Sequence, residues 1–476
     1  MATIDLILKN GKIVTSSGIF EGGLGVDSGQ IVAIGKEGTL PHADRVIDLH
    51  DNLLMPGFID AHCHCHGMGR SDWEDFATGT TAAAAGGITS ILEMPQTLPP
   101  TSTVEAFKEK RKIAERDAVV NFGLYGGAGS QNIDEIPRIA REGAIAFKTF
   151  MPHPSPGRER DFWGMYVTDD GSFLEVLTTV ARTGLISCVH AENWQIADYL
   201  AKKLRSEARN DLPAFLESRP GITEAEGISR AAMLASASEA RVHICHVSAK
   251  EAVEVISRVK QDGQPLTAET CPHYLTFTAD EIGHLGPYAK INPPIRSAED
   301  RTMLWKALRN GSIDIIASDH GPFTRELKEI GREDIWKASM GAPTLDAMLP
   351  VMLTHVNRGC ISVQDLVRVM SENVARIFGL YPRKGILRIG ADGDMVVVDL
   401  KKKKKLRIDE FRTKAKEIAV LYDALEVEGL PVATIVNGTE VMRDGIVTGK
   451  PGTGSFISPL KKGECSKGDS GEMSRL

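Results

Sequence analysis

The 476-residue sequence has few cysteines and no long apolar run. Its seven cysteines include no Cys-x-x-Cys pair, which argues against a disulfide framework and a thiolate zinc site. No apolar run reaches the roughly 18 to 20 residues that a membrane-spanning helix needs. The first residues also turn polar too early for a secretory signal. We therefore expect a cytoplasmic protein that has no membrane partner.

The sequence also lacks an excess of basic residues. Lys and Arg number 56 against 63 Asp and Glu, and the formal net charge is −7. That balance disfavours nucleic-acid binding through a basic face, so we expect no nucleic-acid partner. The length allows one large barrel with a smaller satellite domain. Composition leaves 13 histidines unexplained, and their positions carry most of the functional argument.

The two ends of the chain are both rich in short strand patterns separated by turn residues. Asn10-Gly11 and Ser28-Gly29 mark turns near the start, and Asp-Gly and Asn-Gly pairs recur in 390–447. Each end is too small to fold alone, so we predict one β-sandwich built from residues 1–54 and 379–458. The Lys401–Lys405 run is interpreted as a solvated connection, and 459–476 as a flexible tail.

The middle of the chain alternates short apolar runs with segments compatible with helices. Near-continuous apolar runs bounded by turns are typical of parallel strands that are buried on both faces. The eight runs are 57–64, 88–95, 118–125, 144–151, 185–192, 242–248, 265–271 and 313–320. Eight βα units predict an α/β fold with a TIM-like (β/α)8 barrel over residues 55–378. The stretch 193–238 is then an extended connection.

Active sites of such barrels lie at the carboxyl ends of the strands, where this chain places most of its unusual polar residues. Alternate residues on a strand face the same way, so His62 and His64 should both point into the barrel mouth. The further strand ends contribute Lys148, His190, His246 and Asp319. We expect all six side chains to meet at one mouth.

Lys148 lies inside an apolar run, where a lysine is rarely buried without a partner. Burial favours the neutral amine, which can react with CO2 to give a carbamate, N6-carboxylysine. Its two oxygens and the four histidines would bind two divalent metal ions. Nitrogen and oxygen ligands of this kind suit zinc, although cobalt and manganese also fit. Two such ions activate water and polarise a carbonyl, and Asp319 is placed to move the proton to a leaving nitrogen.

Eight motifs resemble the cyclic amidohydrolases of the amidohydrolase superfamily. They read MPGFIDAHCH, TGTTAAAAGGITSILEMP, FKTFM, HAEN, HICHVSAKEA, AETCPHYL, INPPIR and ASDHGP. This group comprises dihydroorotases, allantoinases and dihydropyrimidinases or hydantoinases. The resemblance implies a barrel with a β-sandwich and a binuclear centre on His62, His64, carboxylated Lys148, His190 and His246. It also implies that Asp319 is both a ligand and the proton shuttle.

Substrate charge separates the members of this group. Dihydroorotases hold a substrate carboxylate with an arginine and an asparagine, where this chain has His66 and Gln96. The tyrosine with which hydantoinases bind the oxyanion is replaced by His153. Asn292 matches a position where the family holds the ring amide through backbone groups. The segments GRSDWEDFATGTTAAAAGGIT, ESRPGITEAEGI and CPHYL are most similar to allantoinases.

We therefore expect a hydrolase that opens the ring of a small neutral cyclic ureide, with allantoin converted to allantoate in purine catabolism as the leading choice. His66, Gln96, His153 and Asn292 are the predicted substrate-binding residues. The alternatives are a dihydropyrimidinase, hydantoinase or dihydroorotase, or a catalytically inactive scaffold relative. The resemblance also implies a homo-oligomer, either a dimer or a tetramer.

Overall fold

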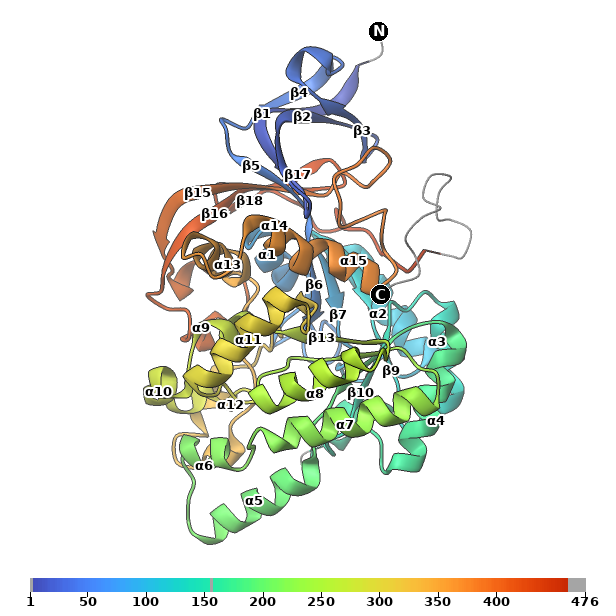
Figure 1. The fold of residues 1–476 in the computed structure, drawn as a ribbon, viewed down its shortest axis with the longest axis vertical. Helices are drawn as coiled ribbons and strands as arrows, with labels where there is room; N and C mark the ends of the chain where they lie inside the picture. The colour runs from blue at the N-terminus through green and yellow to red at the C-terminus, as the bar shows by residue number, and fades with distance from the viewer. Residues whose placement is uncertain (1–2, 155–156, 461–476) are drawn as a thin grey trace.

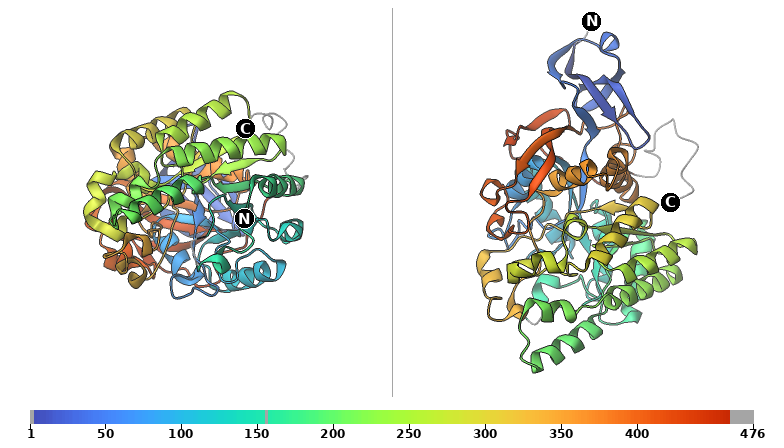
Figure 2. Two further views of the ribbon diagram at one scale, coloured as in Figure 1. Left: turned by 90° about the horizontal axis from the view of Figure 1, so that it is seen from below. Right: turned by 60° about the vertical axis from the view of Figure 1, so that its left-hand side comes forward.

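The computed structural model describes residues 3–154 and 157–460. A barrel surrounded by helices forms the larger body, and a β domain stands on one end of it (Figure 1). The two further views in Figure 2 show the same division, with strands from the start and the end of the chain in the β domain. The predicted α/β barrel with a β-sandwich is confirmed.

Each of the eight predicted apolar runs contains one parallel barrel strand, so the alternation of apolar runs with helical segments predicted all eight strands. The strands are β6 (Phe58–Cys63), β7 (Ile88–Glu93), β8 (Asn121–Leu124), β10 (Phe147–Phe150), β11 (Ser187–His190), β12 (Val242–Ile244), β13 (Leu266–Thr270) and β14 (Ile315–Ile316). A two-residue strand, β9 (Gly126–Gly127), continues β8 and pairs with β10. The strands are shorter than the apolar runs because each run includes residues on one or both sides of its hydrogen-bonded strand.

Two sets of backbone contacts close the barrel. Between β8 and β10, the Ile145 amide donates to the Leu124 carbonyl at 2.9 Å. Between the first and last strands, the His64 amide donates to the His320 carbonyl at 2.9 Å, and Cys63 bridges to His320. The carboxyl ends of all eight strands therefore surround a single mouth.

Helices follow the strands and cover the outside of the barrel. The helices are α1 (Phe76–Ala85), α2 (Val104–Asp117), α3 (Ile136–Arg141), α4 (Asp170–Thr183), α5 (Trp194–Ser206), α6 (Leu212–Glu217), α7 (Ile222–Ala237), α8 (Lys250–Gln261), α9 (Pro272–Thr276), α10 (Ala279–Ile282), α11 (Ala298–Asn310), α12 (Arg325–Glu329), α13 (Met348–Asn357), α14 (Val363–Val367) and α15 (Asn373–Ile377). The predicted extended connection 193–238 folds into α5, α6 and α7. No helix in the described ranges is long and apolar enough to cross a membrane.

The β domain is one nine-stranded sheet that joins both ends of the chain. Its strands are β1 (Ile4–Val14), β2 (Ile19–Asp27), β3 (Gln30–Gly35), β4 (Ala43–Asp48), β5 (Leu53–Pro56), β15 (Met395–Lys405), β16 (Glu426–Val436), β17 (Thr439–Arg443) and β18 (Ile446–Val447). The seam between the two ends is the antiparallel pair of β5 and β15, in which Val398 faces Leu53. Leu8, Leu24 and Ile435 are among the side chains of its own buried core.

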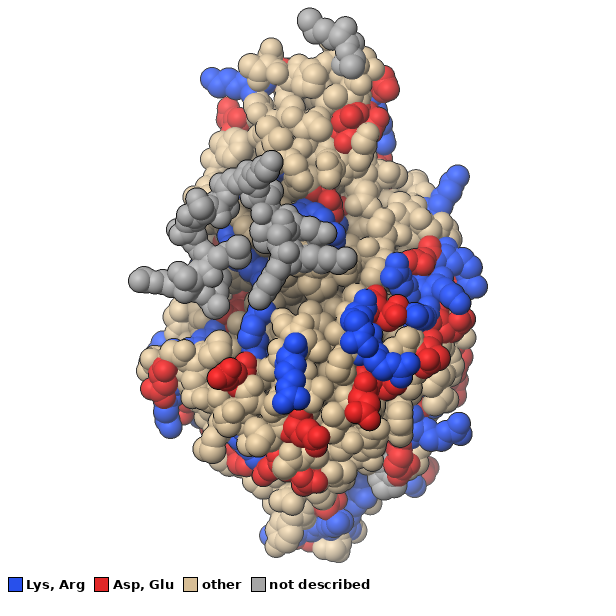
Figure 3. All heavy atoms as spheres, turned by 90° about the vertical axis from the view of Figure 1, so that its right-hand side faces the viewer, with Lys and Arg blue, Asp and Glu red and all other residues tan. Residues whose placement is uncertain are grey.

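The Lys401–Lys405 run is not a connection as we interpreted it, because it forms the second half of β15. Its side chains are exposed, so the prediction of solvation was right and that of a loop was wrong. Residues 461–476 of the predicted tail lie outside the described residues. On the face drawn in Figure 3, basic and acidic side chains lie among one another, as the balanced charge suggests.

The β domain joins the barrel at the amino end of β6, away from the mouth. Only Gly57 separates β5 from β6, and a Cβ atom there would lie 2.2 Å from Thr89 Oγ1, so this junction has no room for a side chain. Asp394 lies near the same junction, where it accepts hydrogen bonds from Asn121 Nδ2 at 3.1 Å and the Asn437 amide at 2.8 Å. The buried Lys384 ammonium also donates to Asp394.

Replacing Asp394 should reveal how much this junction contributes to stability. Asp394→Ala leaves the Lys384 ammonium and Asn121 amide with fewer acceptors in a buried place, so we expect the free energy of unfolding to fall by about 3 kcal/mol or more. Urea denaturation measures the change. The matched control is Glu428→Gln, which breaks the exposed pair of Glu428 with Lys403 and should cost less than about 1 kcal/mol. An equal fall in the free energy of unfolding in the two variants would show that Asp394 does not stabilise this junction more than an exposed ion pair does.

Candidate metal centre

One cavity at the carboxyl ends of the strands collects nine of the ten predicted site residues. It has a volume of about 120 Å³. The nine residues that line it are His62, His64, His66, Gln96, Lys148, His190, His246, Asn292 and Asp319. The candidate metal ligands among these residues were predicted because they lie at the carboxyl ends of the barrel strands. They meet in space although the chain separates them by up to 257 positions.

His153 is the predicted residue that the structure does not bring into this cavity. Its side chain is exposed, and its ring lies 4.4 Å from the Trp194 ring and 5.7 Å from the Tyr166 ring, measured between centroids. The proline residues on either side were a signal for this surface position. An oxyanion contact by His153 therefore has no support in the geometry.

The carboxylate of Asp319 lies beside the first two histidines. Asp319 Oδ1 is 3.4 Å from His62 Nε2 and 3.8 Å from His64 Nε2. The other two histidines adjoin them, with ring centroids of His62 and His246 5.3 Å apart and those of His190 and His246 4.5 Å apart. Four imidazoles and one carboxylate thus share one small volume.

Three of the site residues have left-handed backbone conformations, which residues other than glycine rarely adopt. The φ angles are 49° at His66, 39° at His246 and 44° at Asp319. Such conformations cost about 1 to 3 kcal/mol each and persist only where surrounding contacts hold them. The His246 amide donates to Glu269 Oε1 at 3.2 Å, and the Ser318 amide beside Asp319 donates to Asp60 Oδ1 at 2.8 Å. These buried carboxylates hold the chain where it bends into the mouth.

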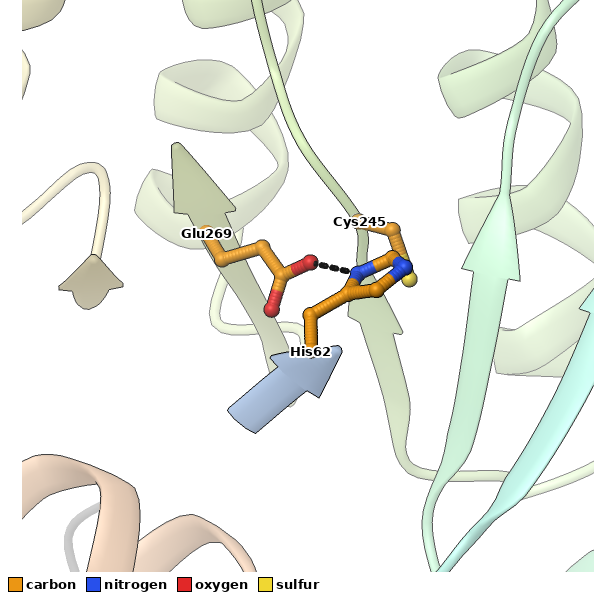
Figure 4. A group of neighbouring side chains, drawn as sticks. All are labelled: His62, Cys245 and Glu269. Carbon is orange, nitrogen blue, oxygen red and sulfur yellow. Dashed lines mark hydrogen bonds and ion pairs between the residues drawn. The ribbon is translucent and has the colours of Figure 1, made fainter. Parts of the chain in front are cut away.

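Glu269 is the most connected site residue that sequence reasoning missed. Its Oε1 accepts a hydrogen bond from His62 Nδ1 at 2.5 Å (Figure 4), and Oε2 lies 3.1 Å from His243 Nε2. Burial alone would raise the pKa of Glu269, but His62 and His243 hold it below its usual value. Because Glu269 occupies Nδ1 of His62, the Nε2 lone pair is left to face Asp319. A glutamate inside an apolar strand run was the available signal.

Lys148 is fully buried at the centre of the mouth. Its Nζ is 3.0 Å from Cys245 Sγ and 5.0 Å from the Phe150 ring centroid. Figure 4 shows Cys245 beside His62 and Glu269, and these three residues offer ligand atoms within 4.8 Å of one another. The described residues place no carboxylate within ion-pair distance of Lys148, which leaves its amine available for reaction.

His190 and Asn292 are linked by a second buried carboxylate. Glu192 Oε2 lies 3.3 Å from His190 Nε2 and accepts a hydrogen bond from Asn292 Nδ2 at 3.1 Å. Although burial opposes ionisation, Arg219 and His190 hold the pKa of Glu192 at about 2. Arg219 Nε also donates to Asn292 Oδ1 at 2.5 Å. The Asn292 side chain is therefore occupied, which leaves the backbone there to contact a ligand.

His66 faces the cavity from the end of the first strand segment. Its Nδ1 lies 2.8 Å from the Gln96 carbonyl oxygen, which can only accept, so Nδ1 carries the proton. Burial lowers the pKa of His66 to about 3, and the ring is neutral. Its Nε2 is buried with no partner in the described part of the chain, so it is a free acceptor.

The remaining wall of the cavity is largely apolar and was not predicted from the sequence. The additional lining residues include Phe150, Phe162, Phe323, Met340 and Arg158. The Arg158 guanidinium is paired with Asp161 at 2.5 Å. These residues lie at strand ends and in connecting segments, where no periodicity points to a shared site.

The donor set fits two divalent cations. Nδ1 of His64 and Nδ1 of His246 are buried without a hydrogen-bond partner in the described residues, so the protein alone does not satisfy either ring. Burial lowers the pKa of His62 to about 4, which keeps it neutral. It also raises the pKa of Asp319 to about 8. Neutral imidazoles and a carboxylate are the ligands that zinc and similar ions bind.

Comparison with known proteins defines the class of this molecule. The Amidohydrolase family model matches residues 53–441, and the chain belongs to that family. An L-hydantoinase of Paenarthrobacter aurescens is 39% identical over 456 residues, which are 95% of this chain and 98% of the relative. An allantoinase of Rubrobacter xylanophilus is 36% identical over 467 residues, covering 98% of this chain and 100% of the relative.

Solved structures give the same result. An L-hydantoinase (dihydropyrimidinase) from Arthrobacter aurescens has a TM-score of 0.92 at 39% identity, covering 96% of this chain and 100% of that chain. A D-hydantoinase has a TM-score of 0.88 at 32% identity, covering 96% and 99%. The chain is therefore an enzyme, a cyclic amidohydrolase of the hydantoinase and allantoinase type.

Glu269 offers a test of the centre that leaves its metal-binding side chains in place. Glu269→Ala frees His62 Nδ1 and His243 Nε2, and we expect metal affinity to fall by about 10- to 100-fold. Competition with a zinc-binding dye measures the affinity. Thr267→Ala is the matched control, because Thr267 contacts only the other nitrogen of His243, at 2.8 Å. Unchanged affinity in Glu269→Ala would contradict an orienting role for this carboxylate.

Proposed function

We propose that this enzyme opens the five-membered ring of a hydantoin by hydrolysing a cyclic amide bond, and that the ring carries an apolar substituent. One observation carries the proposal. The cavity brings the proposed metal-binding residues together with four apolar side chains, Phe150, Phe162, Phe323 and Met340, which form its apolar wall. The hydantoinase relative supports the same choice.

In this proposal His62, His64, Lys148, His190, His246 and Asp319 bind two divalent ions, preferably zinc. When bound, such ions polarise a carbonyl group and lower the pKa of water. Lys148 carries an N6-carboxyl group, which converts a buried amine into two oxygen ligands. Its complete burial and the absence of a carboxylate partner among the described residues support this modification.

Asp319 is the proton carrier in this proposal. Its carboxylate accepts a proton from the attacking water and then donates it to the ring nitrogen as the C–N bond breaks. Its position beside His62 and His64, and burial that raises its pKa to about 8, support this role.

The polar part of the ring would be held by groups that face it across the cavity. His66 Nε2 accepts a hydrogen bond from a ring N–H, because its proton is fixed on Nδ1 by the Gln96 carbonyl. The backbone at Asn292 supplies a second contact, since its side chain is occupied by Glu192 and Arg219. The apolar wall then receives the substituent.

Allantoin is the second candidate, and a specific observation favours it. The cavity also presents Gln96 and Arg158, whose polar groups could bind the ureido group of allantoin. The motif resemblance in 69–89 and the allantoinase relatives support this reading. Arg158 is already paired with Asp161, however, which weakens the case for a polar substituent.

A substrate panel distinguishes the two candidates. We expect kcat/KM for 5-benzylhydantoin to exceed that for allantoin by about tenfold or more, because burying an aromatic ring against the apolar wall stabilises the complex. Dihydroorotate should be the poorest substrate. Phe162→Ala should reduce this preference, whereas Trp163→Ala, at an exposed neighbouring position, should not. Faster turnover of allantoin than of every hydantoin would favour the second candidate instead.

Asp319→Asn tests the proton carrier. The amide preserves the shape of the side chain but cannot accept and return a proton, so kcat should fall by about 10² to 10⁴. Steady-state kinetics with metal analysis of the same preparation measures the effect, and we expect the metals to stay bound. Asp346→Asn serves as the control, because Asp346 accepts a backbone hydrogen bond from Arg412 at 2.8 Å and does not line the cavity. Near-normal turnover in Asp319→Asn would refute the role.

A further inference from the structure

Two lysines near the cavity are buried without a carboxylate partner. Lys290 is 3% exposed and Lys328 is fully buried. No carboxylate oxygen lies within 4.0 Å of either ammonium group in the ranges that the structure describes. Buried lysines normally pair with an acid, because an isolated charge is costly to remove from water. What accepts hydrogen bonds from these two amine groups therefore needs an explanation.

Backbone carbonyl groups of one segment take the place of a carboxylate. The three hydrogen bonds of Lys290 Nζ go to the carbonyl oxygens of Ile335 at 2.7 Å, Trp336 at 3.2 Å and Ala338 at 2.6 Å. An ammonium group has three N–H donors, so all of them are used. Lys328 Nζ donates to the carbonyls of Lys290 at 2.9 Å and Ser339 at 3.1 Å.

The segment that these lysines hold continues directly into the cavity wall. Met340 and Gly341 line the cavity, and the Gly341 amide donates to the Lys290 carbonyl at 3.1 Å. Lys290 therefore binds residues 335–341 twice, through its side chain and its backbone. It also lies two residues before Asn292, which lines the cavity as well.

On its other side, the same segment touches the backbone that follows Asp319. A Cβ atom on Gly341 would lie 2.8 Å from the Gly321 carbonyl oxygen, so the two chains are in close approach. The Gly321 amide donates to the Ala342 carbonyl at 3.0 Å. Residues 340–342 thus stand between Lys290 and the segment that carries Asp319.

We propose that Lys290 is a positioning residue that fixes the separation between Asn292 and Met340–Gly341, and thereby the width of the substrate cavity. Lys328 supports it by binding the Lys290 carbonyl. The segment 335–341 has only one short 3-10 turn, Ile335–Lys337, and the two lysines donate hydrogen bonds to four of its carbonyls, those of Ile335, Trp336, Ala338 and Ser339. The inference rests on the proposed function in so far as this cavity binds the substrate.

The test compares Lys290→Met with Lys337→Met. Methionine keeps the long apolar stem but donates no hydrogen bond. We expect KM for the best hydantoin of the panel to rise by about 10- to 100-fold while kcat changes by less than about threefold. Lys337 lies in the same segment but is 69% exposed at its side chain and pairs with Asp334, so its variant should behave as the wild type.

Hydrogen–deuterium exchange of the metal-loaded enzyme without substrate gives a readout that does not need turnover. In Lys290→Met, the backbone amides of 335–341 should exchange at least about tenfold faster, with protection elsewhere in the barrel unchanged. If Lys290→Met does not fold, Lys328→Met removes two of the five hydrogen bonds and should show the same effects to a smaller degree.

The outcomes separate the two proposals. Unchanged exchange in 335–341 overturns the positioning role, and so does a fall in kcat at constant KM. A third outcome is that the wild type opens no hydantoin or allantoin ring while Lys290→Met still loses protection in 335–341. In that case the proposed substrate is wrong, but Lys290 still holds the segment 335–341 in place.

Discussion

The structure depends on one constraint, which is that the polar side chains at the carboxyl ends of the barrel strands are buried and each needs a partner. The barrel forces them together because parallel strands end at the same rim. Glu269 satisfies His62 and His243, and Glu192 satisfies His190. These contacts also decide which ring nitrogen stays free. The orientation of the candidate ligands therefore follows from the requirement to satisfy buried groups, before any metal is bound.

The same requirement is met by different chemistry at the outer part of the mouth. Around the histidines, buried carboxylates act as acceptors, and their charge keeps the rings oriented. Around Lys290 and Lys328, backbone carbonyls act as acceptors, and they tie a segment with little regular structure to the barrel. The side chains around the histidines are held by the strands, whereas the segment 335–341 is held by the two lysines together with a few backbone hydrogen bonds, such as that from the Ser339 amide to the Leu327 carbonyl at 2.8 Å.

The sequence predicted the parts of the fold and site that have a regular period. Eight apolar runs each contain one strand, and the alternation of His62 and His64 placed both on the mouth side. Glu269 and Lys290 were missed because their importance comes from contacts with residues far away in the chain. The Lys401–Lys405 run was misjudged because a lysine run predicts solvation, and an exposed strand in a sheet is solvated as well. His153 was predicted because it occupies the position of the hydantoinase tyrosine. The segment around it leads its side chain away from the cavity, so position along the chain alone did not predict the contact.

The difference between regular strands and irregular connecting segments explains why the reaction class could be predicted more firmly than the substrate. The candidate metal ligands lie in or just after the barrel strands, so the pattern of apolar runs was enough to predict them. In the proposed function, the substituent of the ring would meet Phe162, Phe323 and Met340, which lie outside the barrel strands, and Phe150, which ends β10. Connecting segments outside the strands change length and course without disturbing the barrel. Side chains in such segments can therefore differ between related enzymes while the barrel and the candidate metal ligands stay the same.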